Sequence, residues 1–250
     1  MVNVFEQKTK LNPLTKLIAV FVLGLATLIF PTPWLGFGIL LILIVLSARL
    51  HFLASFSKLV FGFGIPLTLM LLFIQGFYSP KNKTVLIDMG FAELGLEGTM
   101  YALKLVSVLL VFMGAFFLMN QTTPTSTLVA SLMRSGLNAK AGYLVLASLN
   151  VVPQMNRRVK IIKEAQEARG VSTKGNLIHR FKSFLPLIGP VVLSSFTDAQ
   201  ERGMTLETRG FGIQGVKPTS LTEVKTSSAD YIVRAALILL LGFVVIIHFF

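Results

Sequence analysis

The sequence predicts an all-α integral membrane protein with about five transmembrane helices and a cytoplasmic module of long amphipathic coupling helices. Hydrophobic residues make up 54% of the 250 residues, charged residues make up only 14%, and the mean hydropathy is +0.75. A soluble domain of average composition carries about 25% charged residues. The apolar residues are gathered in runs, and most Lys and Arg residues flank those runs, which is typical of membrane-spanning segments.

The first two apolar runs cover residues 17–30 and 34–48, and Pro31 and Pro33 separate them. Each run is shorter than the roughly 20 residues that a transmembrane helix needs. We therefore predict a tight helical hairpin that crosses the membrane fully or nearly so. In either case the chain returns to the side that it left.

Residues 59–77, 101–119 and 231–250 are stronger predicted spans. A polar loop over residues 78–99 joins the first two of them. This pattern gives three predicted domains: residues 1–119 with about four transmembrane helices, residues 120–230 with the coupling module, and residues 231–250 with the C-terminal transmembrane helix.

Gly62, Gly64 and Pro66 lie near the start of the third run. Glycines there would allow a close approach of another helix, and a proline removes one backbone hydrogen bond and favours a kink. Gly and Pro are also common in membrane helices in general. Both interpretations stay open from the sequence.

The basic residues predict the orientation of the chain. Of the 23 Lys and Arg residues, only Lys81, Lys83 and Lys104 fall on the side opposite to the N-terminus and to residues 120–230. Because cytoplasmic loops carry an excess of Lys and Arg, we predict a multi-pass protein of the cell membrane with a cytoplasmic N-terminus and an extracellular C-terminus. The net charge of +12 belongs to these flanks, so we expect membrane lipid and no nucleic acid as a partner.

The chain lacks the residue patterns of common catalytic and metal sites. It has no cysteine, and its three histidines are far apart in sequence. Residues 170–175 contain glycines, Ser and Lys, but they lack the spacing and the strand context of a phosphate-binding loop and are interpreted as a linker. The predicted spans hold essentially no ionisable residue near their centres, unlike those of secondary transporters. We therefore expect no enzymatic activity, no cofactor and no metal, with energy for any transport supplied by other chains.

Two shorter apolar stretches, residues 141–153 and 184–196, lie within the long polar region. They are too short to span comfortably and each continues into a polar helical pattern. Spacings of three and four residues predict one apolar face on each helix. The predicted faces carry Val159, Ile162, Ala165 and Ala168 on the first helix, and Leu193, Phe196, Ala199, Gly203 and Leu206 on the second.

Both of these predicted helices end in the pattern Glu-x-Arg-Gly. The two copies are Glu167, Arg169 and Gly170, and Glu207, Arg209 and Gly210. Glycine suits the left-handed position just past a helix C-terminus. An arginine at such an end carries a planar set of donors that fits a carboxylate. One such arginine usually only interacts with the helix dipole, whereas two copies at equivalent positions favour a binding function.

The sequence resembles the transmembrane T-component of energy-coupling factor (ECF) importers, the EcfT/CbiQ-like family. The resemblance rests on Glu-Ala-Gln-Glu-Ala-Arg-Gly at residues 164–170, on Thr-Leu-Glu-Thr-Arg-Gly-Phe-Gly at residues 205–212, and on Val-Pro-Gln at residues 152–154. It also covers most of the chain in layout, with N-terminal spans, a cytoplasmic helical module and one last span.

The resemblance implies that two three-residue signatures bind two ABC ATPase subunits. These are Ala168, Arg169 and Gly170 (the first tripeptide), and Thr208, Arg209 and Gly210 (the second tripeptide), with Glu164, Glu167 and Glu207 in supporting roles. Thr208 stands where the family commonly has alanine, a departure that leaves the role of the arginine intact. The resemblance further implies a separate small substrate-binding membrane protein, the S-component, that carries a vitamin or a metal ion such as cobalt or nickel.

Two alternatives stay open from the sequence. The first is the permease subunit of a conventional ABC importer, because Glu164-Ala165-Gln166, Gly170 and Leu185-Pro186 are similar to the cytoplasmic loop of that class, although Leu-Pro comes a few residues late. The second is a membrane scaffold that recruits cytoplasmic proteins and transports nothing. Both transport interpretations require a tightly bound ATPase pair, and the scaffold does not.

Overall fold

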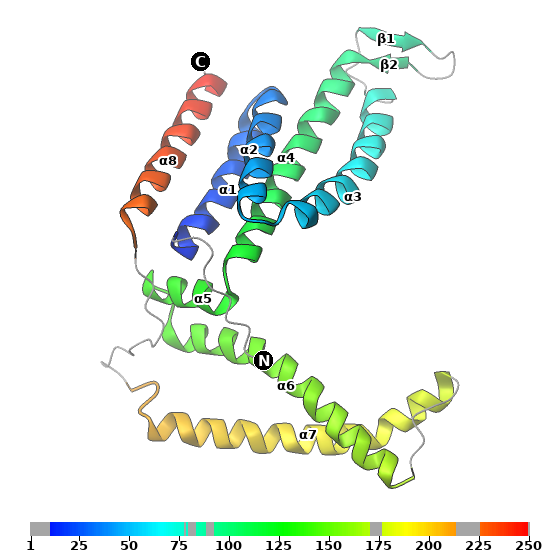
Figure 1. Cartoon of the computed structure of the whole chain (residues 1–250), viewed down its shortest axis with the longest axis vertical. Coiled ribbons are helices and arrows are strands. Elements are labelled where there is room, and N and C mark those ends of the chain that lie inside the picture. The colour runs from blue at the N-terminus through cyan, green and yellow to red at the C-terminus, as the bar shows by residue number, and fades with distance from the viewer. Residues whose placement is uncertain are drawn as a thin grey trace. The chain divides into compact units, whose positions relative to one another are not determined.

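The structure of the chain is a computed structural model (Figure 1). It describes residues 11–77, 79, 84–88, 93–170, 177–213 and 226–249, without the side chains of residues 85–88, 93 and 177–187. The predicted topogenic residues Lys8, Lys10, Lys81 and Lys83 and most of the predicted linker 170–175 lie outside the described residues. Where the chain is described, it is helical apart from one two-stranded hairpin, so the predicted all-α class is confirmed.

The apolar runs form α1 (Pro13–Ile29), α2 (Trp34–Arg49), α3 (Leu53–Leu71), α4 (Leu96–Thr122) and α8 (Ser228–Phe249). Among the described residues, three segments are long and apolar enough to cross a membrane: α3 with the following π-helical turn η1 (Leu72–Phe77), α4 and α8. Helices α1 and α2 have 17 and 16 residues. At 1.5 Å per residue each is about 25 Å long, against about 30 Å for the hydrocarbon core of a bilayer.

The ends of the first helices follow from local chemistry. Asn12 caps α1 by accepting a hydrogen bond from the N–H of Leu14 at 2.9 Å, and Pro13 occupies the first helical position. Proline there loses no helical hydrogen bond. After α2, His51 has a φ of 61°, and Phe52 donates its N–H to the carbonyl of Ser47 at 2.9 Å. His51 therefore ends α2 in the left-handed conformation that glycine more often adopts.

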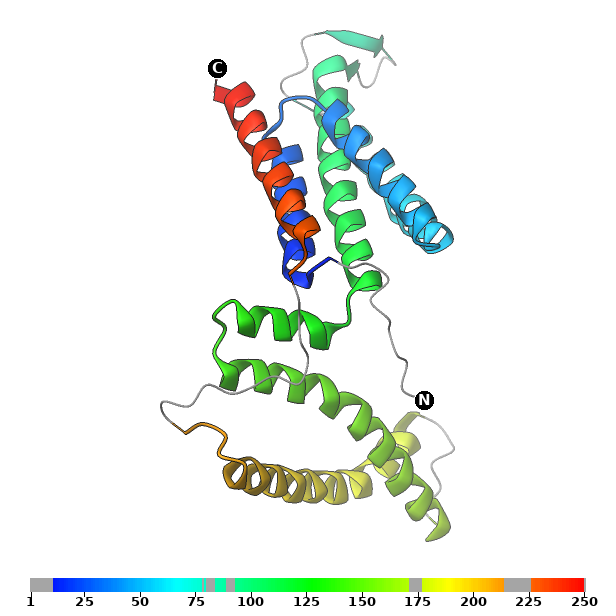
Figure 2. The same cartoon turned by 60° about the vertical axis from the view of Figure 1, so that its left-hand side comes forward.

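Helix α4 is the central helix of the first compact unit, which comprises residues 1–131 and 224–250. Helices α1, α2 and α3 pack against α4, and α8 packs against α1. In Figure 2, α1 and α8 lie on one side of α4, and α2 and α3 lie on the other. The buried core around α4 contains Val20, Ile39, Leu40, Leu43, Phe56, Val106, Leu110, Val111, Ala115, Leu118 and Met119.

Small residues allow these helices to approach each other closely. A Cβ atom on Gly36 of α2 would lie 2.4 Å from the Oγ atom of Ser107 in α4, and a Cβ atom on Gly114 would lie 3.0 Å from the ring of Phe56 in α3. Small residues at such contacts are a general device of membrane helix packing. Gly64 of α3 belongs to this group, because its Cβ would lie 3.1 Å from Leu110.

Polar side chains join the starts of α1 and α8. Asp230 is fully buried and accepts hydrogen bonds from the backbone N–H groups of Asn12 and Ser227, both at 2.8 Å. Arg234 donates from Nε to Oγ1 of Thr15 at 2.9 Å. Because a buried carboxylate needs hydrogen-bond partners, these contacts hold the two helix starts side by side.

The end of α4 lies at the same end of the unit. The Nζ atom of Lys16, in the first turn of α1, donates to the carbonyl of Thr122 at 3.1 Å and to Oγ1 of Thr123 at 2.9 Å. A cation at a helix C-terminus also interacts favourably with the helix dipole. The segment between α4 and α8 therefore leaves and returns at one end of the bundle.

The polar loop predicted over residues 78–99 contains a short hairpin, β1 (Val85–Asp88) and β2 (Glu93–Gly95), paired antiparallel. Strands of four and three residues are too short to show a period-2 pattern, so the sequence did not predict them. Thr84 donates from Oγ1 to the carboxylate of Glu97 at 2.7 Å, which connects the hairpin to the first turn of α4.

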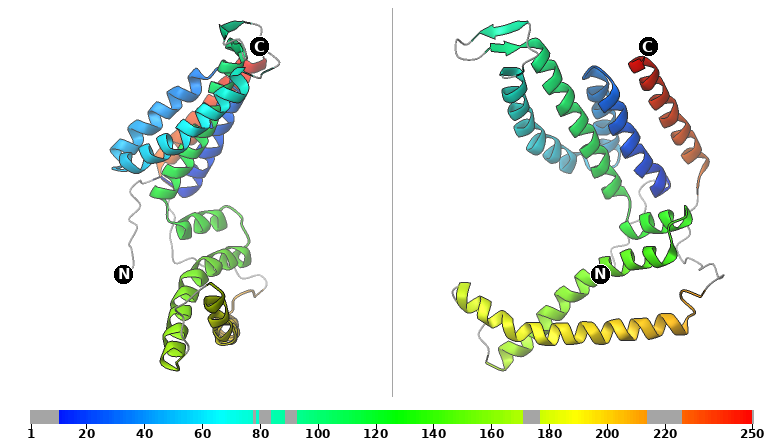
Figure 3. Two further views of the ribbon diagram at one scale, coloured as in Figure 1. Left: turned by 90° about the vertical axis from the view of Figure 1, so that its right-hand side faces the viewer. Right: turned by 180° about the vertical axis from the view of Figure 1, so that it is seen from behind.

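The second compact unit, residues 132–223, contains the end of α5 (Thr125–Arg134), α6 (Ala139–Ala168) and α7 (Leu177–Thr208). Each of the two predicted apolar stretches continues into a polar helical segment, as expected. The first lies in the N-terminal half of α6 and the second in the middle of α7, and these helices have 30 and 32 residues. They run antiparallel and cross each other (Figures 1 and 3). The predicted domain boundaries after residues 119 and 230 describe which segments lie in the membrane, and they stay a prediction.

Candidate coupling site

The first tripeptide forms the C-terminal end of α6. The helix ends at Ala168, and Arg169 is the C-cap residue, with its N–H bonded to the carbonyl of Ala165 at 3.3 Å. Gly170 has a φ of +88° and donates its N–H to the carbonyl of Glu167 at 3.0 Å. A residue with a Cβ atom would be strained at this φ, so the predicted glycine-terminated helix end is confirmed.

The second tripeptide ends α7 in the same way. Gly210 has a φ of +74° and donates its N–H to Glu207 at 2.9 Å. The N–H of Phe211 bonds to the carbonyl of Leu206 at 2.9 Å. These two bonds together make a Schellman motif, which satisfies carbonyls that the end of the helix leaves open.

Both arginines are exposed, and neither side chain makes a hydrogen bond or ion pair within the part of the chain that the structure describes. Two of the supporting glutamates have lysine neighbours one turn earlier: Glu164 lies 4.0 Å from Lys160, and Glu167 lies 3.9 Å from Lys163. Exposed pairs of this kind contribute only about 0.3–0.5 kcal/mol. The guanidinium groups are therefore available to an anionic group on another molecule.

The surroundings of the two tripeptides differ. The ring of Phe211, directly after the second tripeptide, lies 5.2 Å from the ring of Tyr143 in α6. Gly212 has a φ of +90°, and a Cβ atom there would lie 3.2 Å from Cε of Lys140. Around Gly170, in contrast, a Cβ atom would meet no described atom within 4 Å. The two residues that follow the second tripeptide thus pack against the start of α6.

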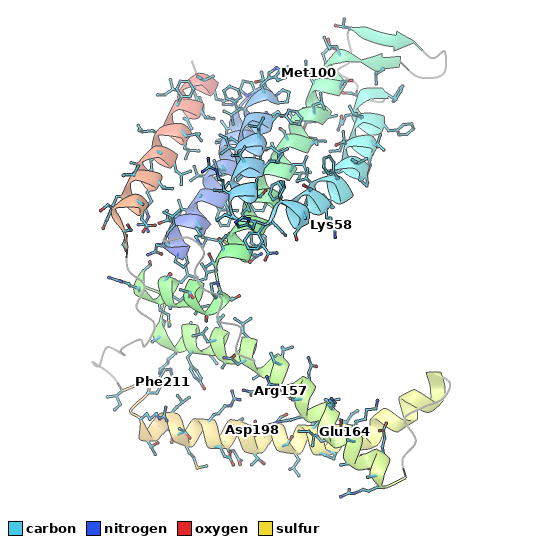
Figure 4. The ribbon with its side chains drawn as sticks, in the orientation of Figure 1. Lys58, Met100, Arg157, Glu164, Asp198 and Phe211 are labelled. Carbon is cyan, nitrogen blue, oxygen red and sulfur yellow. The ribbon has the colours of Figure 1, made fainter. Side chains whose placement is uncertain are left out.

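Charged side chains connect α6 and α7; Asp198 of α7, labelled in Figure 4, is one of them. Arg158 forms an ion pair with Asp198 and donates from Nη1 to the carbonyl of Ser194 at 3.1 Å. Arg202 of α7 donates a hydrogen bond to the side-chain oxygen of Gln154 of α6. Gln154 belongs to the Val-Pro-Gln pattern at residues 152–154, whereas no motif in the sequence includes Arg158, Asp198 or Arg202. The only signal for the Arg158–Asp198 pair was opposite charge on two amphipathic helices.

A groove of about 350 Å³ lies between α6 and α7. Its lining residues are Tyr143, Leu144, Ala147, Val151, Gln154, Met155, Arg158, Ser195, Asp198, Ala199, Arg202, Gly203 and Leu206. Ala199, Gly203 and Leu206 had been predicted on one face of their helix; all three line the groove, where Gly203 and Leu206 are half-buried and Ala199 is exposed.

Of the other predicted apolar positions, Val159 and Ile162 are half-buried and four are exposed among the described residues. Leu193 and Phe196 are 70% and 65% exposed, and Ala165 and Ala168 are also exposed. The described contacts of α6 with α7 run from Tyr143 to Arg158, so the last turns of α6 extend beyond them. Two crossing helices can share only part of their length. Their spacing still places the four exposed residues on one apolar face of each helix, and no described residue covers that face at these four positions.

The comparison with known families decides the class of the molecule. Residues 6–219, which include both tripeptides, match the family model CbiQ, described as cobalt transport protein. The chain belongs to this family. It is an EcfT/CbiQ-like T-component of an energy-coupling factor transporter and a membrane protein, so the resemblance found in the sequence is confirmed.

Proteins named energy-coupling factor transporter transmembrane protein EcfT are similar over much of this chain. The protein of Lactococcus lactis subsp. cremoris is 26% identical over 245 residues, with 92% of this chain and 90% of the relative covered. The protein of Listeria innocua is 28% identical over 216 residues (81% and 79% covered). The protein of Streptococcus thermophilus is 32% identical over 179 residues (64% and 66% covered).

Proposed function

We propose that this T-component transmits the ATP-driven motion of two ABC ATPase subunits to a separate substrate-binding membrane protein, the S-component, during uptake of a vitamin or a metal ion. One observation carries the proposal: two exposed arginines end two crossed helices with the same glycine-terminated geometry. Two equivalent cationic ends suit two equivalent partner subunits.

Each arginine acts as an anchor for one ATPase. A guanidinium group binds a carboxylate through two parallel hydrogen bonds, which set direction as well as affinity. Ala168 and Gly170 present little bulk beside the first arginine, so a partner can approach the backbone closely. When ATP binding brings the two ATPases together, the attached ends of α6 and α7 move with them and displace the surface on which the S-component rests.

Thr208 in the second tripeptide is compatible with the same role. Its hydroxyl donates to the carbonyl of Thr205 at 3.0 Å, within its own helix. The hydroxyl is therefore satisfied without a partner, and the side chain presents a methyl group as alanine would. Glu164, Glu167 and Glu207 are close in sequence to the arginines and support them by balancing the positive charge at each helix end.

The proposed orientation places the N-terminus and both tripeptides in the cytoplasm and the C-terminus outside. Arg49 and Lys58, near the α2–α3 connection, and the many basic residues between α4 and α8 support it. The starts of α1 and α8 and the end of α4 lie at one end of the bundle, as this orientation requires.

The test is mild-detergent purification of the tagged chain from native membranes, with mass spectrometry of the proteins that accompany it. Two ABC ATPase subunits together with a small, very hydrophobic protein are the expected result, and the last of these would identify the cargo. Recovery without any ATPase would contradict the proposal and favour a scaffold. Recovery of ATPases with a soluble substrate-binding protein and no small membrane protein would favour a conventional importer.

A further inference from the structure

The contact between α6 and α7 combines an apolar surface with a directional charged one. Ala147, Val151 and Leu206 line the apolar part. Hydrophobic contact is non-directional, so this part allows the helices to slide or rotate against each other. The ion pair of Arg158 with Asp198 is directional, because a planar guanidinium group must align with the carboxylate.

The side chains of Arg158 and Asp198 are 27% and 30% exposed. Salt therefore screens this pair less than it screens the exposed Lys160–Glu164 and Lys163–Glu167 pairs on α6. Arg158 is held a second time by the carbonyl of Ser194 at 3.1 Å. Two bonds from one guanidinium group to one turn of α7 restrict both sliding and rotation at this point.

A second arginine connects the helices in the opposite direction. Arg202 of α7 donates to Gln154 of α6, whereas Arg158 of α6 donates to α7. Ser195 of α7 also donates from its hydroxyl to the sulfur of Met155 in α6 at 3.5 Å. The polar contacts of the crossing therefore lie on residues 154–158 of α6 and 194–202 of α7, which is about one and a half turns and about two and a half turns.

The ion pair lies at an equivalent distance from both tripeptides. Arg158 is eleven residues before Arg169, and Asp198 is eleven residues before Arg209, which corresponds to roughly 16 Å along each helix. Because the helices run antiparallel, the two tripeptides lie on opposite sides of the crossing (Figures 1 and 3). A rotation at the crossing changes the distance between the two arginines directly.

We propose that the Arg158–Asp198 pair is the pivot of the crossed helices: a pair of positioning residues that sets the separation of Arg169 and Arg209. In the transporter, the pivot keeps ATP hydrolysis linked to transport, a consequence that rests on the proposed function. Without the pair, the helices remain in apolar contact but lose a defined crossing angle. Motion of the helix end that carries Arg169 is then no longer transferred fully to the helix end that carries Arg209.

The crossing is measured as the distance between one spin label on α6 and one on α7, by electron spin resonance on this chain reconstituted in lipid nanodiscs. The chain has no cysteine, so labels attach only at introduced sites. Ile161→Cys on α6 and Met204→Cys on α7 are suitable because these side chains are 64% and 59% exposed. The parent is expected to give one narrow distance distribution, and Asp198→Ala a distribution at least twice as wide.

Two further variants separate the pivot from general damage. The exchange Arg158→Asp with Asp198→Arg restores opposite charges and is expected to restore a narrow distribution. Glu201→Ala removes an exposed acidic residue from the next turn of α7 and is expected to leave the distribution unchanged. The proposal would be overturned if Asp198→Ala gave a distance distribution as narrow as that of the parent. It would also be overturned if the exchange variant gave a distribution as wide as that of Asp198→Ala.

The link to transport is measured on the complex purified with its partners, as substrate taken up per ATP hydrolysed. Asp198→Ala is expected to lower this ratio at least fivefold while ATPase subunits still copurify at the parent level. An unchanged ratio would overturn the transport part of the proposal. If the parent chain recovers no ATPase at all, the proposed function fails, and the distance measurement still decides whether the pair is a pivot.

Discussion

The two tripeptides share a sequence pattern and a helix-ending geometry, but they differ in what surrounds them. The second tripeptide is continued by a full Schellman motif, and Phe211 packs on Tyr143. A Cβ atom at Gly170 would meet no described atom. The same Glu-x-Arg-Gly pattern therefore ends two helices whose described surroundings differ. The residues after the second tripeptide contact the start of α6, whereas the described contacts of the first tripeptide lie within α6 itself. We therefore expect the second end to be the stiffer of the two.

The largest effect is expected from removing both arginines. Truncating one partner of a desolvated charge pair costs about 2–5 kcal/mol, and about 1.4 kcal/mol is a factor of ten. We therefore expect Arg169→Ala and Arg209→Ala each to lower substrate uptake by at least tenfold and the double variant to abolish it. Uptake is measured in cells that lack the endogenous chain.

The matched control is Arg157→Ala, which removes an exposed arginine from the same helix α6. Its uptake should stay within twofold of the parent. If the double variant transported at the parent rate, the arginines would have no coupling role.

The next largest effect is expected from replacing Gly170 or Gly210 by alanine, and it should differ between the two positions. Alanine in the left-handed conformation costs about 1–2 kcal/mol, so Gly170→Ala and Gly210→Ala should both weaken ATPase binding by roughly tenfold. Gly210→Ala should be the more harmful, because its Cβ would also lie 3.1 Å from Ile213. Copurification of ATPase subunits at increasing salt measures the effect. Equal binding in both variants and the parent would contradict the geometry at these ends.

A smaller effect tests the stiffness difference directly. Tyr143→Ala removes the ring contact with Phe211, which is worth about 0.5–1.5 kcal/mol beyond burial. Hydrogen exchange should become up to about tenfold faster in the amides of residues 209–213 and stay unchanged in the last turn of α6. Faster exchange at both ends, or at neither, would show that the two ends are not held differently.

The smallest effect is expected at Thr208. Thr208→Ala removes a hydroxyl that bonds only within α7 in the described structure, so uptake should stay within twofold of the parent. Thr208→Glu places a negative charge beside Arg209 and should lower uptake severalfold through competition for the guanidinium group. A large loss in Thr208→Ala would mean that the hydroxyl contacts a partner.

Much of the fold could be predicted from local features of the sequence. The apolar runs are long enough to show the membrane helices, and glycine at residues 170 and 210 indicates where two helices end. These features depend on neighbouring residues only. The contact of Tyr143 with Phe211 and the pairing of Arg158 with Asp198 join residues far apart in sequence. Each depends on the angle at which two helices cross, for which the chain carries no local signal.

The same limit applies to the apolar face of α6. Ala165 and Ala168 have the spacing of an apolar face, but the described contacts of α6 with α7 end at Arg158. Spacing shows which side of a helix is apolar. It does not show which part of that side a second helix covers, because that depends on the crossing point.

The most direct measurement of the coupling role is photo-crosslinking in native membranes. A photoreactive amino acid is placed at Ala168 in one variant, at Thr208 in a second, and at Glu201 as a control on the same helix as Thr208. Capture of an ABC ATPase subunit from both tripeptides and not from Glu201 is the expected result. Capture of no ATPase from either position, with both probes attached only to this chain itself, would contradict the proposed coupling role.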